Sequence, residues 1–249
     1  MMNLLKKSLV GVVGAGSIAC FMLAGNTVFA ANLASKASSS GTLTQAQQQD
    51  LSNLKTKGSA EITRRLTSLN SALTTVGATT KLSSSDKSYL ESEINTEITG
   101  LTSLQTTLNS ETTLSSARAD VQSIFSEYRV YALVLPKTRL VKAADGEQNT
   151  DTQLTTLANS LQTQITTDGN SGKNVNSAQN TLNDMNTQIT NAQSIASSIE
   201  SKVLTFAPSD YNTDHTILSG DLAQLKTAHA DNLAAYNDGK TIAADLKNL

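Results

Sequence analysis

The feature that most constrains the fold of this chain is an apolar stripe between residues 175 and 203. Its members are apolar residues three or four positions apart, with polar residues between them: Val175, Ala178, Leu182, Met185, Ile189, Ala192, Ile195, Ile199 and Val203. This spacing puts the apolar side chains on one face of an α-helix, and the near-heptad repeat is typical of coiled-coil packing. Because such a helix depends on a neighbour that covers its stripe, the segment predicts a helical bundle.

Further segments carry apolar residues at helical spacing. They span residues 51–76, 83–108, 110–128, 136–165 and 214–246. Local signals mark several ends: Gly77 stops the first segment, Ser83 begins the second with a capping residue, and Pro136 can begin a helix at its first turn. We therefore expect an all-α fold, a bundle of about five to six long antiparallel amphipathic helices with coiled-coil-like packing, in a single domain over residues 45–249.

Some helix boundaries stay open. Residues 146–151 are weakly apolar, so the fourth helix could break there. Residues 130–135 form a continuous apolar run, which could be a short extended segment before Pro136, although a buried helix end is our preferred interpretation. Residues 207–212 are expected to be a loop, and the last helix is expected to begin near Asp214.

The first 30 residues have the pattern of a cleavable secretory signal peptide. Lys6 and Lys7 form a short positive segment, residues 9–23 are largely apolar, and Ala30 ends a stretch that suits signal peptidase. We therefore expect export by the general secretory route and cleavage after Ala30. Residues 31–44 are then a flexible, Ser-rich lead-in.

Two alternatives for this segment stay open. It could remain uncleaved as a membrane anchor, because its apolar run is close to spanning length. It could also be a lipoprotein signal that is acylated at Cys20. Since Cys20 is the only cysteine of the chain, cleavage after Ala30 leaves a mature protein with neither a disulfide nor a thiolate metal ligand.

The charge of the chain argues against nucleic acid as a partner. The formal net charge is −2, and the loss of Lys6 and Lys7 with the signal peptide makes it −4. A mildly acidic chain has no general attraction for phosphate backbones or anionic lipid. No second apolar run approaches membrane length. We therefore expect no nucleic-acid partner and no membrane span in the mature chain.

The sequence predicts no catalytic, cofactor or metal site. His215 and His229 fall on one predicted helix but about 21 Å apart, too far to share a metal ion. Serine is so frequent that any Ser-His-Asp ordering carries no weight. We therefore expect a protein that is not an enzyme and that binds no cofactor.

One stretch is a candidate partner-binding site, and we call it the aromatic-basic patch. Its members are Tyr128, Arg129, Tyr131, Lys137 and Arg139. Tyrosine and arginine often anchor interfaces, so the patch could bind an anionic cell-wall or lipid component. The alternative is packing, with the aromatic rings between helices. In that case Arg129 is partly buried and pairs with Asp120 or Glu61, while Lys137 and Arg139 remain solvated.

The same stretch resembles a pattern in uncharacterised secreted helical proteins of actinobacteria and candidate-phyla bacteria. The shared sequence is Tyr-Arg-Val-Tyr-Ala-Leu-Val-Leu-Pro-Lys at residues 128–137, followed by Ala-Ala-Asp at 143–145, and residues 61–66 are similar too. The resemblance covers about residues 55–205. It implies a signal peptide, a helical bundle and no assigned activity, so it assigns a role to no residue.

These features together favour an exported, non-enzymatic helical protein, on the cell surface or secreted, with a structural, spacer or interaction role. Its partner is then a cell-wall or cell-surface component or another protein. The alternative function is a binding module that captures an anionic cell-wall or lipid component through the aromatic-basic patch.

Overall fold

The computed structural model describes residues 43–249, and every regular element within them is helical. The longer helices are α2 (Gln45–Ala78), α3 (Ser84–Ser110), α4 (Leu114–Ser126), α5 (Leu135–Asn170), α6 (Asn176–Leu204) and α8 (Asp221–Lys247). A π-helical turn, η2 (Val130–Val134), joins α4 to α5, and the short α7 (Pro208–Thr213) lies between α6 and α8. The predicted all-α bundle is confirmed. The predicted signal peptide and most of the lead-in lie outside the described residues.

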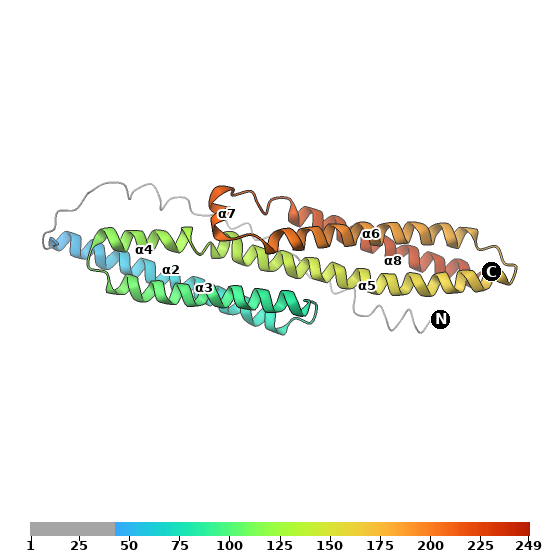
Figure 1. Ribbon diagram of the computed structural model, residues 1–249, viewed down its shortest axis with the longest axis horizontal. Helices are drawn as coiled ribbons and strands as arrows, with labels where there is room; N and C mark the ends of the chain where they lie inside the picture. Colours follow the sequence, from blue (N-terminus) through green and yellow to red (C-terminus); the bar gives the residue numbers. More distant parts are fainter. Residues whose placement is uncertain (1–42) are drawn as a thin grey trace.

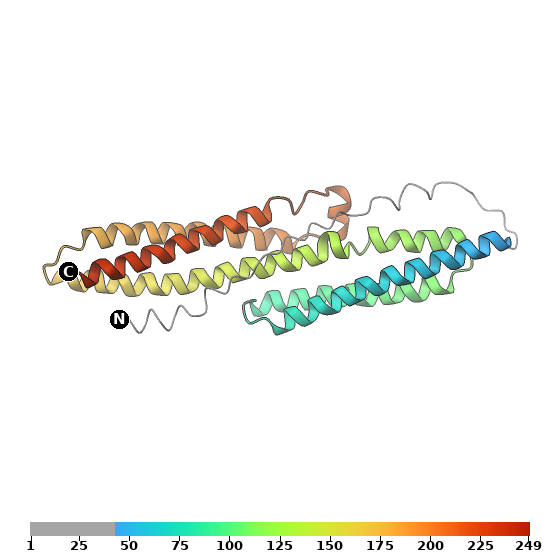
Figure 2. The ribbon, with the colours of Figure 1, turned by 180° about the vertical axis from the view of Figure 1, so that it is seen from behind.

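The helices form two three-helix bundles that lie end to end along a rod (Figures 1 and 2). In one half α2, α3 and α4 pack together, and in the other α6 and α8 pack on α5. The segment α4–η2–α5 runs along the rod through both halves. Because an α-helix rises 1.5 Å per residue, the 36 residues of α5 alone extend about 54 Å. The segment α4–η2–α5 therefore spans most of the length of the rod.

In the second half, the buried residues of α6 and of α8 follow one another at alternating steps of four and three. On α6 they are Ala178, Leu182, Met185, Ile189, Ala192, Ala196, Ile199 and Val203. On α8 they are Asp221, Leu225, Ala228, Asn232, Ala235, Gly239, Ile242 and Leu246. The α6 stripe thus matches the prediction closely, whereas that for α8 was partly wrong, because Leu233 is 53% exposed. Close helix approach explains the small residues: a Cβ on Gly239 would lie 3.1 Å from Leu157 Cδ2.

The region between α4 and α5 differs from a simple helix end. Arg129 has φ 40°, in the left-handed region, and its carbonyl accepts bonds from the amides of Leu133 (2.8 Å) and Val134 (3.3 Å). Val130, Leu133 and Val134 are fully buried. The preferred interpretation of a buried helical segment is therefore correct. Pro136 stands in the first turn of α5, where a missing N–H breaks no helical bond.

Three other boundaries correct the sequence interpretation. The fourth helix does not break at residues 146–151, because α5 continues through them and Asp151 is buried. Residues 207–212, expected to be a loop, mostly form α7. The last helix begins at Asp221, not near Asp214, because Gly220 adopts a left-handed conformation (φ 82°) directly before it. None of the described helices is both long enough and apolar enough to cross a membrane.

Candidate functional site

The five residues of the aromatic-basic patch do not form one surface. Lys137 is completely buried, Tyr128, Arg129 and Tyr131 are half-buried, and Arg139 alone among the five is exposed. The four that are not exposed contact other helices or connecting segments of the rod. The patch therefore joins elements of the rod to one another.

Lys137 lies in the region where the two halves meet, and its ammonium group has three partners inside the protein. Nζ is 2.7 Å from Glu93 Oε1, 3.1 Å from the Tyr89 hydroxyl and 2.9 Å from the carbonyl oxygen of Phe206. These partners belong to α3 and to the segment after α6, so one side chain of α5 links both halves. The expectation that Lys137 is solvated is wrong. Its long apolar stem fits the core while its charged end is fully bonded.

Arg129 has no acidic partner among the described residues, contrary to the packing alternative. Its Nε donates to Asn212 Oδ1 at 2.6 Å, and its guanidinium lies 5.4 Å from the centre of the Tyr211 ring. Asn212 Nδ2 in turn donates to the carbonyl of Ser126, the last residue of α4. The left-handed backbone at Arg129 turns its side chain toward α7. Arg129 therefore helps to hold α7 against the end of α4.

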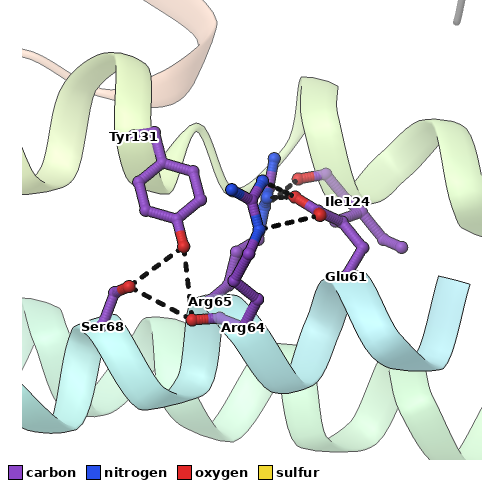
Figure 3. A network of polar contacts seen from close by, with 6 residues as sticks. All are labelled: Glu61, Arg64, Arg65, Ser68, Ile124 and Tyr131. Atoms are coloured by element: carbon purple, nitrogen blue, oxygen red, sulfur yellow. Dashed lines mark hydrogen bonds and ion pairs between the residues drawn. The ribbon is translucent and has the colours of Figure 1, made fainter. Parts of the chain in front are cut away.

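Glu61, one of the two acids expected to pair with Arg129, pairs instead with Arg64 and Arg65 of its own helix (Figure 3). Arg65 is buried, and desolvation lowers its pKa from 12.5 to about 10, while the nearby Tyr131 acts in the opposite direction. Its Nε also donates to the carbonyl of Ile124 on α4 at 3.4 Å. The hydrogen bond from Arg65 therefore ties α2 to α4, and the ion pair with Glu61 compensates the charge of the buried guanidinium.

Tyr131 and Tyr128 contact helices of the first half. The Tyr131 hydroxyl donates to the carbonyl of Arg64 at 3.2 Å and is 3.0 Å from Ser68 Oγ (Figure 3). The guanidinium carbons of Arg64 and Arg65 lie 4.7 and 5.0 Å from its ring centre, a favourable cation–π arrangement. The Tyr128 ring packs on α3 where a Cβ on Gly100 would otherwise stand, and desolvation raises the pKa of Tyr128.

Sequence reasoning missed a second polar group where the two halves meet, made by Asp86, Asp145 and Glu200. One carboxylate oxygen of each lies within 4.8 Å of the others, although the residues belong to α3, α5 and α6. Ser83 arranges two of them. Its backbone N–H donates to Asp145 Oδ2 at 2.7 Å, and its hydroxyl donates to Asp86 Oδ2 at 2.7 Å. Ser83 also caps α3, as predicted, by accepting from the Asp86 amide.

Two carboxyl groups of this cluster, those of Glu200 and Asp145, hold protons more strongly than free ones. Desolvation raises the pKa of Glu200 from 4.5 to about 7; the charges of Asp86 and Asp145 raise it further, while a bond from Gln148 opposes the shift. Desolvation also raises the pKa of Asp145, against the bond from Ser83. Ionised carboxylates this close together repel one another. A hard divalent cation bound by the three oxygens would relieve this repulsion, and so do protons shared among the carboxyl groups.

Glu97 is a half-buried acid in the region where the halves meet. Desolvation raises its pKa from 4.5 to about 7, the charge of Glu93 raises it further, and Lys137 lowers it. Lys137 is therefore faced by two carboxyl groups and pairs directly with one of them, Glu93.

The two histidines are placed differently from the prediction. His215 precedes α8, and its ring meets that of Tyr211 edge to face with centroids 5.0 Å apart. His229 lies on α8, with Nδ1 3.1 Å from Glu147 Oε1 of α5. The histidines therefore do not share one helix, as had been expected.

We compared the chain with protein-family models, with curated proteins and with solved structures, and none of the three comparisons found a match.

Proposed function

We propose that the chain is an exported, non-enzymatic helical protein with a spacer or scaffold role at the cell surface or in the medium. The observation that carries this proposal is the rod, in which two bundles share one composite helix along the long axis (Figure 1). Long helices packed side by side resist bending, so the rod holds partners at its two ends at a fixed separation. The buried groups that link the halves, above all Lys137 with Glu93, support the same role because they keep the bundles in line.

The export part of the proposal rests on the sequence of residues 1–30 and has a direct test. A tagged full-length chain is expressed in a bacterial host, the cells are fractionated, and the exported protein is sequenced from its N-terminus. We expect the sequence to begin at Ala31. Full-length protein in the cytoplasm would contradict export, full-length protein in the membrane would support the anchor alternative, and lipid on Cys20 would support a lipoprotein.

The role itself is tested by binding of the mature chain to whole cells and purified cell-wall fractions. If the rod is a spacer, charge reversal at Arg139 leaves retention unchanged, as does the matched reversal of Lys57, an exposed residue of α2. Retention that is lost with Arg139→Glu, but kept with Lys57→Glu and at an unchanged melting temperature, would instead favour the binding module. Lys137 is unsuitable for this test because it is buried.

A further inference from the structure

The apolar core of the second half is interrupted by a polar layer. One apolar cluster ends at Ala144 on α5, Ala196 on α6 and Leu225 on α8. The other begins at Leu154, Ile189 and Ala235 on the same helices. Between the clusters lie Asp151 of α5 and Asn232 of α8, each only 3% exposed, with the buried Ala192 and Ala228. An acid and an amide therefore occupy core positions of this bundle.

The polar atoms of this layer are incompletely bonded. Neither carboxyl oxygen of Asp151 has a hydrogen-bond partner, and neither does Asn232 Oδ1. Asn232 Nδ2 donates to Glu147 Oε2 at 3.0 Å. Burial of an acceptor with no donor is costly, and burial of an unpaired charge costs more. The layer thus holds no donor for Asn232 Oδ1, and no hydrogen bond of normal geometry reaches the carboxyl of Asp151.

The charged neighbours of Asp151 supply no compensating cation. On α5 the neighbouring carboxylate is Glu147, whose other oxygen faces the solvent-exposed His229 of α8. On α6 the layer is faced by Ala192, and the carboxyl of Glu200 lies beyond it, bonded to Gln148. None of the ion pairs among residues 43–249 includes Asp151. Ionised Asp151 is therefore an uncompensated charge in the core.

We propose that Asp151 is a proton-binding site that controls how firmly α8 is held on α5. With a proton taken from water, the carboxyl of Asp151 is neutral and can donate to Asn232 Oδ1, an acceptor that otherwise has no donor. When the proton returns to water, the layer contains a buried charge and α8 loosens there. This inference rests on the fold and is independent of the proposed function.

The pH range follows from the environment of the carboxyl. Desolvation, with a smaller contribution from the charge of Glu147, raises the pKa of Asp151 from 3.8 to about 6 in the packed bundle, and Asn232 opposes the shift. An acid whose pKa is higher in the packed state stabilises that state at pH values below its free pKa. It loses this contribution as the pH rises through its pKa in the packed state. Opening of α8 at this layer should therefore become about 100-fold more favourable between pH 4 and pH 8.

The test is hydrogen exchange of the mature chain, compared at the same pH with the Asp151→Asn variant, in which the amide resembles the protonated acid. We expect residues 228–236 to open about 100-fold more in the wild-type chain at pH 8 and about equally in both proteins at about pH 3, below the free pKa of the acid. The matched control is Asp231→Asn, on α8 beside Asn232, which should follow the wild-type chain at both pH values.

Two results would overturn the proposal. One is an equal difference between wild type and Asp151→Asn at every pH. The other is protection of the wild-type chain at pH 8 by Mg²⁺, Ca²⁺ or Zn²⁺ that EDTA reverses, because a cation would then occupy the layer in place of a proton. If the Asp151→Asn chain does not fold, NMR titration of the Asp151 carboxyl carbon in the wild-type chain decides, with a pKa near 6 expected and a value near 4 refuting it.

Discussion

Replacement of Lys137 by methionine should destabilise the rod more than any other change in the aromatic-basic patch. Methionine keeps most of the apolar stem but removes the ammonium group, so Glu93 loses its ion-pair partner, and the Tyr89 hydroxyl and the Phe206 carbonyl lose a donor. The loss of one partner from a buried ion pair costs about 3–5 kcal/mol. For a chain of this size that corresponds to a fall in melting temperature of roughly 10 °C.

The assay is urea and thermal unfolding of the mature chain, followed by circular dichroism at neutral pH. The control is Arg139→Met, which removes an exposed charge of the same helix and should change stability by less than about 0.5 kcal/mol. The double variant Lys137→Met with Glu93→Gln should recover part of the loss, because the unpaired carboxylate is gone. A Lys137→Met chain within about 1 kcal/mol of wild type would refute the argument that this lysine links the two halves.

Four further predictions use the same unfolding assay. Gly58→Ala should destabilise by about 1–3 kcal/mol, because its Cβ would lie 2.5 Å from Leu108 Cδ2. In contrast, Gly146→Ala, in a helix and with open space around it, should stabilise by about 0.5–1 kcal/mol. The free energy of unfolding should fall by about 2 kcal/mol between pH 5 and pH 8, because Glu97 and Glu200, with pKa values of about 7, bind protons more tightly in the folded chain. Glu200→Gln should make this decrease smaller, and a free energy of unfolding that rises with pH would refute the prediction. Arg129→Ala should cost only about 1 kcal/mol, since no acid is left unpaired; a loss above 3 kcal/mol would contradict this.

Large apolar residues at regular spacing allowed most of the helices to be predicted from the sequence. The stripe on α6 needed no other information, because Leu182, Met185, Ile189 and Ile199 mark one face at steps of three and four. On α8 the corresponding positions carry mostly small or polar residues such as Asn232. Leu233, which has a large apolar side chain, was therefore predicted to be buried. Extending the 4-3 spacing from Leu225 to Ile242 would have placed Ala228, Asn232, Ala235 and Gly239 in the core.

The polar groups could not be predicted because their partners are distant in sequence. Lys137 and Glu93 are 44 residues apart, and nothing near Lys137 indicates that its ammonium group is enclosed. The cap at Ser83 was predicted from local sequence, but not the bond from its amide to Asp145, 62 residues away. Local spacing defines a helix and the face it buries, whereas ion pairs depend on the register between helices.

The central claim is that two bundles share one composite helix and form a rod, and small-angle X-ray scattering of the mature chain tests it most directly. From Leu114 to Asn170 the segment α4–η2–α5 should extend about 85 Å, which gives a radius of gyration of about 27 Å. A compact globule of the same number of residues would have a radius of about 17 Å. We predict a value near 27 Å and a skewed distance distribution that reaches at least about 85 Å; a value near 17 Å with a symmetric distribution would contradict the account.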